Sequence, residues 1–185
     1  ENESLTLVYA DATKGWLSVE EGTGFVGQSF ITATGGNSVV TSGDFKIHTF
    51  TGPGTFSVSS ISNNPTLNKV DYLVVAGGGG GGAGHGGGGG AGGFRYYLNT
   101  TNSPTPAFPA SPLNNFPSGT AVTVTATDFP IVVGGGGAQG SPGPGNTPGG
   151  NGNPSSFSTI TSTAGGFGSG AQSAPSYNGG PGGSG

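Results

Sequence analysis

The sequence predicts a mainly β protein with almost no helix, in which short antiparallel strands precede a glycine-rich domain of packed polyproline-II-type strands. Three observations support this fold class. Apolar residues occur in short β-branched or aromatic blocks bounded by Gly, Asn, Pro and Ser. Almost no segment has the periodicity of a helix. Glycine accounts for 43 of the 185 residues and is concentrated in three runs, at 77–93, 134–152 and 165–185.

The predicted strands divide the chain into an N-terminal β segment, 1–43, and a glycine-rich domain, 44–185. Trp16 is the largest apolar residue of the first part, and we expect it to anchor a core. The candidate strands, in chain order, are 5–10, 15–19, 38–41, 44–50, 54–61, 70–76, 121–126, 131–133 and 157–163.

Two of these strands differ in the faces that they should bury. The segment 56–62 alternates, with Phe56 and Val58 on one face, so we predict that its other face meets water. The segment 71–76 does not alternate, and we predict that it is covered on both faces. Pro and Asn are frequent in the insert 96–119, which we predict to be a long loop.

The glycine runs need a physical explanation. Fourteen of the 17 residues in 77–93 are Gly, and ordering each backbone costs about 1–2 kcal/mol, with no side-chain burial to offset it. The runs could be flexible linkers. Alternatively, they could pack as polyproline-II strands, whose N–H and C=O groups point sideways toward neighbours at a distance that only Gly permits. We predict packing, so Gly79→Val or Gly88→Val should disrupt folding.

An internal repeat favours packing over linkers. The segment Asp71-Tyr-Leu-Val-Val-Ala-Gly aligns without gaps on Asp128-Phe-Pro-Ile-Val-Val-Gly, and each copy leads into a glycine run. Repeated units commonly bury a face on their neighbours. Because Asp71 and Asp128 recur in register, we predict that both are structural and cap backbone N–H groups where the strands begin.

The composition excludes several classes of partner. The net charge is −4, and the four basic residues are scattered, so the chain lacks the basic patch that nucleic-acid binding requires. The absence of Cys excludes disulfides and thiolate metal sites. No apolar stretch is long enough to span a membrane. We expect the chain to be a piece of a longer or processed protein, because it has no initiator Met.

No catalytic, cofactor or metal site is predicted. Gly77-x-Gly79-x-x-Gly82 matches the dinucleotide fingerprint, but no helix follows it and no acidic residue is placed to bind a ribose. His85 has no carboxylate nearby in sequence, and we expect a hydrogen-bonded spacer or an exposed tip residue. We predict that His48 is a plain surface or edge residue. Nothing resembles a catalytic dyad or triad.

Aromatic residues near the predicted loops have two interpretations. They could stack on sugars, or they could cover the thin edges of a glycine core, which we favour. These residues are Phe94, Tyr96, Tyr97, Phe108, Phe116 and Tyr177. In addition, Asn2-Glu-Ser and Asn99-Thr-Thr match the N-glycosylation sequon, a weak signal in a chain rich in Asn, Ser and Thr.

Three long stretches resemble the glycine-rich domain of tail-fibre and adhesin proteins of tailed bacteriophages, which also occurs in bacterial surface proteins. They are DFKIHTFTGPGTFSV (44–58), VDYLVVAGGGGGGAGHGGGGGAGGFR (70–95) and FPIVVGGGGAQGSPGPGNTPGGNGNPSSFSTITSTAGGFG (129–168). In addition, SLTLVYADATKGWLSVEEG (4–22) resembles the β segment that often precedes this domain. The resemblance implies a sandwich of polyproline-II glycine strands whose loops contact the host, commonly within a homotrimeric fibre.

Two functions therefore compete, and both are extracellular and non-enzymatic. The chain could be a phage tail-fibre module that attaches to a host-surface glycan or protein. Alternatively, it could be a subunit of a bacterial filament or surface layer that polymerises, for example by donating its N-terminal β segment as a strand to the next subunit. No binding residue can be carried over from the family, because recognition loops differ among its members.

Overall fold

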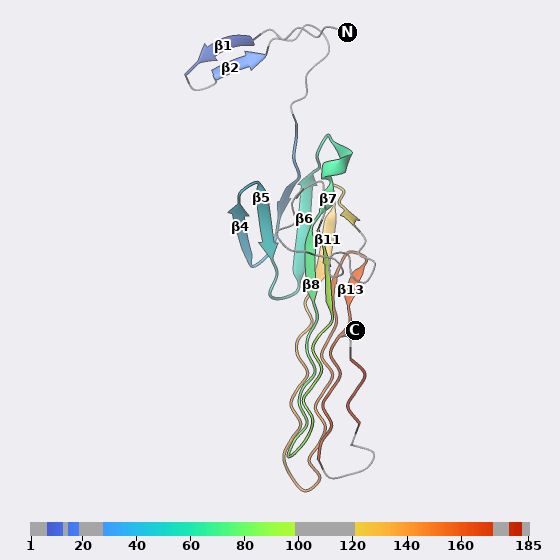
Figure 1. Ribbon diagram of the computed structural model, residues 1–185. Coiled ribbons are helices and arrows are strands. Elements are labelled where there is room, and N and C mark those ends of the chain that lie inside the picture. Colours follow the sequence, from blue (N-terminus) through green and yellow to red (C-terminus); the bar gives the residue numbers. More distant parts are fainter. Residues whose placement is uncertain (1–6, 13–14, 19–27, 99–120, 172–177, 183–185) are drawn as a thin grey trace.

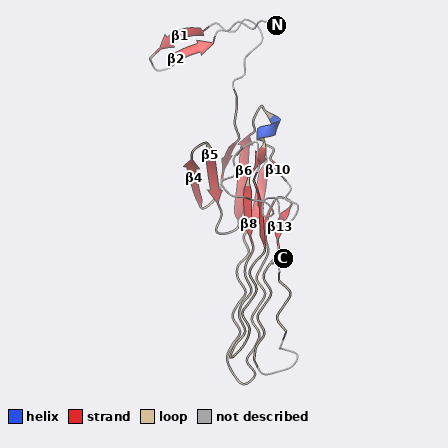
Figure 2. Cartoon of the chain, in the orientation of Figure 1, coloured by secondary structure: helices blue, strands red, loops and turns tan. Residues whose placement is uncertain are grey.

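The computed structural model describes residues 7–12, 15–18, 28–98, 121–171 and 178–182. The described chain is mainly β, and its one helical element is the three-residue 3-10 turn η1 (Pro65–Leu67). Strands occupy one end of the glycine-rich domain, and long extended segments run side by side away from them (Figures 1 and 2). The predicted fold class, mainly β with almost no helix, is confirmed. No helix of the described residues has the length and apolarity needed to cross a membrane.

The N-terminal segment forms a hairpin. β1 (Leu7–Asp11) pairs antiparallel with β2 (Gly15–Ser18), so that Tyr9 lies opposite Trp16, and the register shifts between Tyr9 and Asp11. The side chains of Val8 and Tyr9 are exposed. Whether Trp16 anchors a core stays a prediction, because its side chain lies outside the described part of the structure.

A five-stranded antiparallel sheet organises the glycine-rich domain. Its spatial order is β13-β12-β11-β6-β3. These strands span Thr32–Thr34 (β3), Gly54–Ser60 (β6), Asp128–Val132 (β11), Ser155–Phe157 (β12) and Ile160–Ser162 (β13). Strands far apart in the sequence are therefore neighbours: Phe129 of the second repeat copy lies opposite Phe56 of β6. This long-range pairing closes the base from which the glycine runs extend.

Three two-stranded ladders surround this sheet. β4 (Ser38–Ser42) pairs with β5 (Phe45–Thr49), β7 (Lys69–Val70) with β10 (Val122–Thr123), and β8 (Tyr72–Val75) with β9 (Phe94–Tyr97). Val74 of β8 is buried, whereas its neighbours Leu73 and Val75 are exposed. The prediction that 71–76 is covered on both faces is therefore wrong. Both faces of β8 carry apolar residues, so the sequence pattern could not reveal that only one of them is covered.

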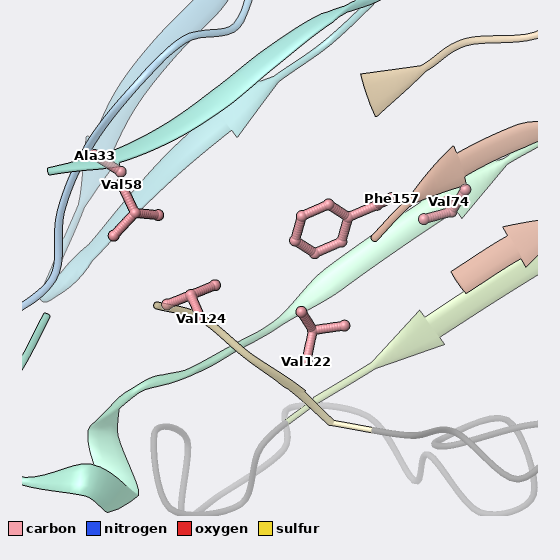
Figure 3. Packing of buried hydrophobic residues seen from close by; sticks show 6 residues of the cluster. All are labelled: Ala33, Val58, Val74, Val122, Val124 and Phe157. Carbon is pink, nitrogen blue, oxygen red and sulfur yellow. The ribbon is translucent and has the colours of Figure 1, made fainter. Parts of the chain in front are cut away.

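The hydrophobic core is small. It consists of the buried residues Ala33, Val58, Val74, Val122, Val124 and Phe157, shown together in Figure 3. Half-buried aromatic rings surround Phe157, with centroid distances of 6.2 Å to Phe56, 6.1 Å to Tyr72 and 6.1 Å to Phe129. Such tilted and edge-on pairs suit the ring quadrupoles. The core joins the repeat copies to the base sheet, and it does not extend into the glycine runs.

Candidate functional site: a glycine sandwich and its distal loops

The extended segments below the sheet form a bundle, which we call the glycine stem. Its six segments, named A to F in chain order, are A (76–83), B (86–93), C (134–140), D (147–154), E (163–171) and F (178–182). None belongs to a β-ladder. Instead, hydrogen bonds recur every third residue: Gly77, Gly80 and Ala83 donate to the carbonyls of Asn153, Gly150 and Thr147 at 3.0, 2.8 and 3.0 Å. A three-residue repeat is that of a polyproline-II strand.

Segment A is the centre of the stem, because it bonds to four neighbours. We call a set of residues spaced three apart along a segment a column, because they face the same neighbour. The amides of one column of segment A, described above, donate to segment D. A second column, Ala76, Gly79 and Gly82, donates to Gly93, Gly90 and Gly87 of segment B at 3.0, 2.8 and 2.9 Å. Its carbonyls accept bonds from segments C and E, as from Gly137 to Gly78 and from Gly168 to Gly80, both at 2.8 Å. Backbone pairing thus takes the place of a side-chain core.

Whether a position requires glycine depends on the column to which it belongs. A Cβ built on Gly79 would overlap the carbonyl of Gly166, with 2.5 Å to its carbon, and one on Gly80 would overlap the carbonyl of Ala138. A Cβ built on Gly88, in contrast, meets nothing within 4 Å. A side chain does occur in that outer column of segment B, because Ala91 lies three residues after Gly88 and is exposed. The prediction that Gly88→Val disrupts folding is therefore wrong, whereas Gly79 has no space for a side chain.

Two loops and the end of segment E meet at the far end of the stem (Figure 1). The first loop joins segments A and B through Gly84 and His85; the second joins C to D and ends at Asn146. A Cβ on Gly84 would lie 2.7 Å from Cγ of Asn146, so the two loops are in contact. The Ala171 amide of segment E donates to the Ala83 carbonyl at 3.2 Å. We call this end the distal tip.

Local geometry fixes these loops. Asn146 has a positive φ of 27°, and its Oδ1 accepts a hydrogen bond from the Gly143 amide at 3.3 Å. The Thr147 hydroxyl accepts a bond from the Ser141 amide at 2.8 Å. Gly84 has a φ of 69°, which glycine adopts readily. His85 is exposed at the tip, which is one of the two placements predicted for it.

The stem and tip carry no ionic charge. The ranges 72–94 and 129–182, which include all six segments, contain no Asp, Glu, Lys or Arg. Among the described residues no three His, Asp or Glu side chains form a group that could hold a metal ion. A partner at the distal tip would therefore meet backbone amides, carbonyls, one imidazole and neutral side chains.

The two repeated aspartates differ in surroundings. Asp128 begins β11, and its Oδ1 accepts a hydrogen bond from the Ser57 hydroxyl at 2.6 Å. Its described partner is thus a side chain of the neighbouring strand rather than a backbone amide. Asp71 lies half-buried just before β8. His48 is half-buried on β5, with Nδ1 2.7 Å from the Gly35 carbonyl oxygen and its ring 5.1 Å from that of Phe56. Because β5 belongs to a two-stranded sheet, His48 is an edge residue, one of the two predicted placements, but it is not a plain surface residue.

Three of the predicted sugar-stacking aromatics lie together on β9, at the base of the stem rather than at its tip. Tyr97 stacks on Tyr72 with centroids 6.0 Å apart, while Phe94 is exposed and contacts Tyr96 edge-on at 5.7 Å. The remaining predicted residues, Phe108, Phe116 and Tyr177, and the sequon residues Asn2 and Asn99 lie outside the described residues.

Sequence reasoning missed the polar residues that fasten the stem. Asn151 Oδ1 accepts the Phe167 amide at 3.0 Å, between segments D and E, and Ser155 Oγ accepts the Gly134 amide at 2.9 Å, where segment C begins. Asn and Ser are common throughout the glycine runs. Only the backbone amide that each side chain meets in the folded chain distinguishes these two, and the sequence alone does not reveal that neighbour.

Comparison with known proteins gave one match. The family described as a glycine-rich domain matches residues 49–185. No curated protein and no solved structure matches the chain significantly.

Proposed function

This chain belongs to the glycine-rich domain family, and we propose that it is a non-enzymatic module of an extended extracellular fibre, a bacteriophage tail-fibre or adhesin segment that attaches to a host. The observation that carries the proposal is the convergence of connecting loops at the end of a stem held by backbone hydrogen bonds. Each eight-residue segment of such a stem spans about 25 Å at about 3.1 Å per residue. The base sheet therefore holds the distal tip away from the fibre body.

The stem suits this task because it is stiff without a large core. Segment A is bonded on four sides, so bending it would break bonds to several neighbours at once. Loops carried by a rigid scaffold are the usual place for recognition residues. Interior glycines such as Gly79 leave no space for a side chain, whereas an exposed loop position such as Gly143 does, so specificity can vary at such positions while the stem is kept.

The chemistry of the tip favours a neutral, hydrogen-bonding ligand such as a surface glycan. Without charged residues in the stem and tip, recognition would not depend on ion pairs. Surface charge interactions weaken as salt shortens the Debye length from about 30 Å at 0.01 M to about 3 Å at 1 M. We expect the attachment of this protein to host cells to be nearly independent of salt over that range.

Binding of the full chain to whole bacterial cells and to an array of glycans tests the proposal. His85→Glu places a charge at the tip and should reduce binding at least about tenfold, which is about 1.4 kcal/mol. Ala91→Glu introduces the same charge at an exposed position of segment B, six residues from His85 or about 19 Å at about 3.1 Å per residue, and should leave binding unchanged. Equal loss in both variants would contradict a binding site at the tip.

The second candidate is a filament or surface-layer subunit. It is favoured by the N-terminal hairpin, in which β1 and β2 pair only with each other among the described strands and expose Val8 and Tyr9. An isolated two-stranded hairpin is marginally stable in water, so it gains from joining another sheet. Concentration-dependent polymers in solution, together with no binding to cells or glycans, would favour the filament over the adhesin.

A further inference from the structure

We propose that β4 is a self-association edge, which pairs antiparallel with β4 of a second copy of this chain. The inference stands apart from the proposed function, because it rests on the base of the molecule and not on the distal tip. β4 belongs to a two-stranded sheet with β5 and has no second neighbour in the described part of the chain. Figure 1 shows β4 on the outer side of β5, away from the central sheet.

The turn of the hairpin determines which backbone groups of β4 are free. Ser42 lies opposite Phe45, and the two-residue turn between them begins at Gly43 with a φ of 56°. In such a hairpin the residues flanking the turn form a hydrogen-bonded pair, and the bonds then alternate along the strand. The N–H and C=O groups of Val39 and Thr41 therefore point away from β5. They form a short row that a new strand can pair with.

Natural β-sheets usually protect such an edge. The common devices are a Lys or Pro on the strand, an inward charge or a bulge. β4 reads Ser-Val-Val-Thr-Ser, without a charge or a proline, and its pairing with β5 is regular over all five residues. All five side chains are exposed. The edge is thus open to strand addition.

The near-palindromic sequence of β4, Ser-Val-Val-Thr-Ser, indicates that the strand that pairs with it is β4 of a second copy. A two-fold axis through Val40 places Val39 opposite Thr41 of the second copy, and Ser38 opposite Ser42. The free groups of Val39 then face those of Thr41, which allows four hydrogen bonds across the new ladder. Each cross-strand pair then contains similar side chains: β-branched Val39 faces β-branched Thr41, and the Ser38 hydroxyl faces that of Ser42. No like charges meet.

The same pairing extends an apolar row that water now covers. Val40 is 53% exposed and lies opposite Ile47, which is 49% exposed, on the hairpin face that also carries Phe45. The opposite face of the hairpin carries His48, whose ring contacts Phe56 of β6. That contact holds the His48 side of the hairpin against the five-stranded sheet. In the dimer, Val40 of one copy lies beside Val40 of the other, and each is flanked by Ile47 of its own copy. The four side chains then form one continuous apolar row across the sheet. A two-stranded hairpin also becomes a four-stranded sheet, which is the more stable unit.

A single introduced cysteine tests the register, because the chain contains no other. Val40→Cys should give a disulfide-linked dimer under mild oxidation, since facing non-hydrogen-bonded residues have Cα atoms about 4.5 Å apart, within disulfide reach. Ile47→Cys is the matched control. Its two copies would lie about three strand spacings, or about 14 Å, apart and should remain thiols. Absence of the Val40→Cys dimer, or equal cross-linking of both variants, would overturn the proposal.

Sedimentation of the full chain from about 1 μM to about 1 mM measures the affinity without cross-linking. Thr41→Pro removes one outward N–H while leaving the bonds to β5, and Val40→Lys brings two like charges together at the axis. Both should weaken the dimer at least tenfold. Leu73→Lys, at another exposed apolar position, should not. A wild-type chain that stays monomeric throughout, or variants that associate as strongly as the wild type, would refute β4 pairing.

Discussion

At the scale of single residues, glycine has opposite consequences in adjacent columns of one stem. In the inner columns, the hydrogen that glycine carries in place of Cβ points at a neighbour's carbonyl, as from Gly79 toward Gly166 and from Gly80 toward Ala138. Such Cα–H···O contacts are weakly favourable, and a methyl group cannot replace the hydrogen. In the outer column of segment B, Gly88 makes no comparable contact and keeps only its entropic cost.

Alanine substitutions at these two positions should therefore differ in sign. Gly79→Ala forces segments A and E apart and should destabilise the fold by about 3 kcal/mol or more, as overpacking does in a well-packed interior. Gly88→Ala should stabilise it by about 0.4–1 kcal/mol, because alanine restricts the unfolded chain and fits an extended backbone. Chemical denaturation monitored by circular dichroism measures both. Equal effects at both positions would contradict the column assignment.

Two buried serines at the base provide a second residue-scale prediction. Ser155 is 3% exposed, and its Oγ accepts the Gly134 amide. Ser162 is 0% exposed, and its Oγ has no hydrogen-bond partner in the part of the chain that the structure describes. Ser155→Ala leaves the half-buried Gly134 amide unpaired and should cost about 1 kcal/mol, whereas Ser162→Ala removes an unpaired buried oxygen and should be neutral or stabilising. Thermal unfolding of both variants measures the difference.

At the scale of the elements, the stem converts backbone pairing into a periodic pattern. In segment A, two of every three amides are bonded to a neighbour: Gly79 and Gly80 donate, whereas Gly78 and Gly81 have no acceptor among the described residues. A β-strand between two neighbours alternates with a period of two. A period of three is specific to polyproline-II packing.

Amide hydrogen exchange measured by NMR should show this period directly. We expect slow exchange at Gly79, Gly80, Gly82 and Ala83, and faster exchange at Gly78 and Gly81, because bonded amides exchange only when the structure opens. The Gly88 amide serves as a reference for an exposed position. Fast exchange across 77–83 would mean that the run is a flexible linker, and uniform protection would contradict the three-residue pattern.

Much of the element order was predictable from the sequence, and the neighbours of each element were not. The alternation in 56–62 and the repeat at Asp71 and Asp128 located β6, β8 and β11. Glycine, however, carries no side chain from which a face could be inferred, so neither the central position of segment A nor the tolerance at Gly88 could be foreseen. The burial of His48 was also missed, because it depends on Phe56 and Gly35 from other elements.

At the scale of the whole molecule, much of the folded structure is held by backbone hydrogen bonds and not by the burial of apolar side chains. The buried hydrophobic cluster holds six residues of the base, and the stem is held by backbone bonds between glycines. Unfolding an ordinary domain exposes apolar surface, which raises the heat capacity, and exposes polar surface, which lowers it. Opening the stem exposes mainly peptide groups. The heat-capacity change should therefore fall well below that of a typical domain.

Differential scanning calorimetry measures the heat-capacity change of unfolding and so tests this prediction. Ordinary domains give about 12–15 cal/mol/K per residue, and we expect about half of that value or less here. Segments that are unordered before unfolding would also lower the figure, so the change should be normalised to the residues whose amides are protected from exchange. A normalised value in the ordinary range would mean that apolar burial, and not backbone packing, stabilises the folded chain. A low value with a sharp transition would show that glycine strands form a cooperative interior without side chains.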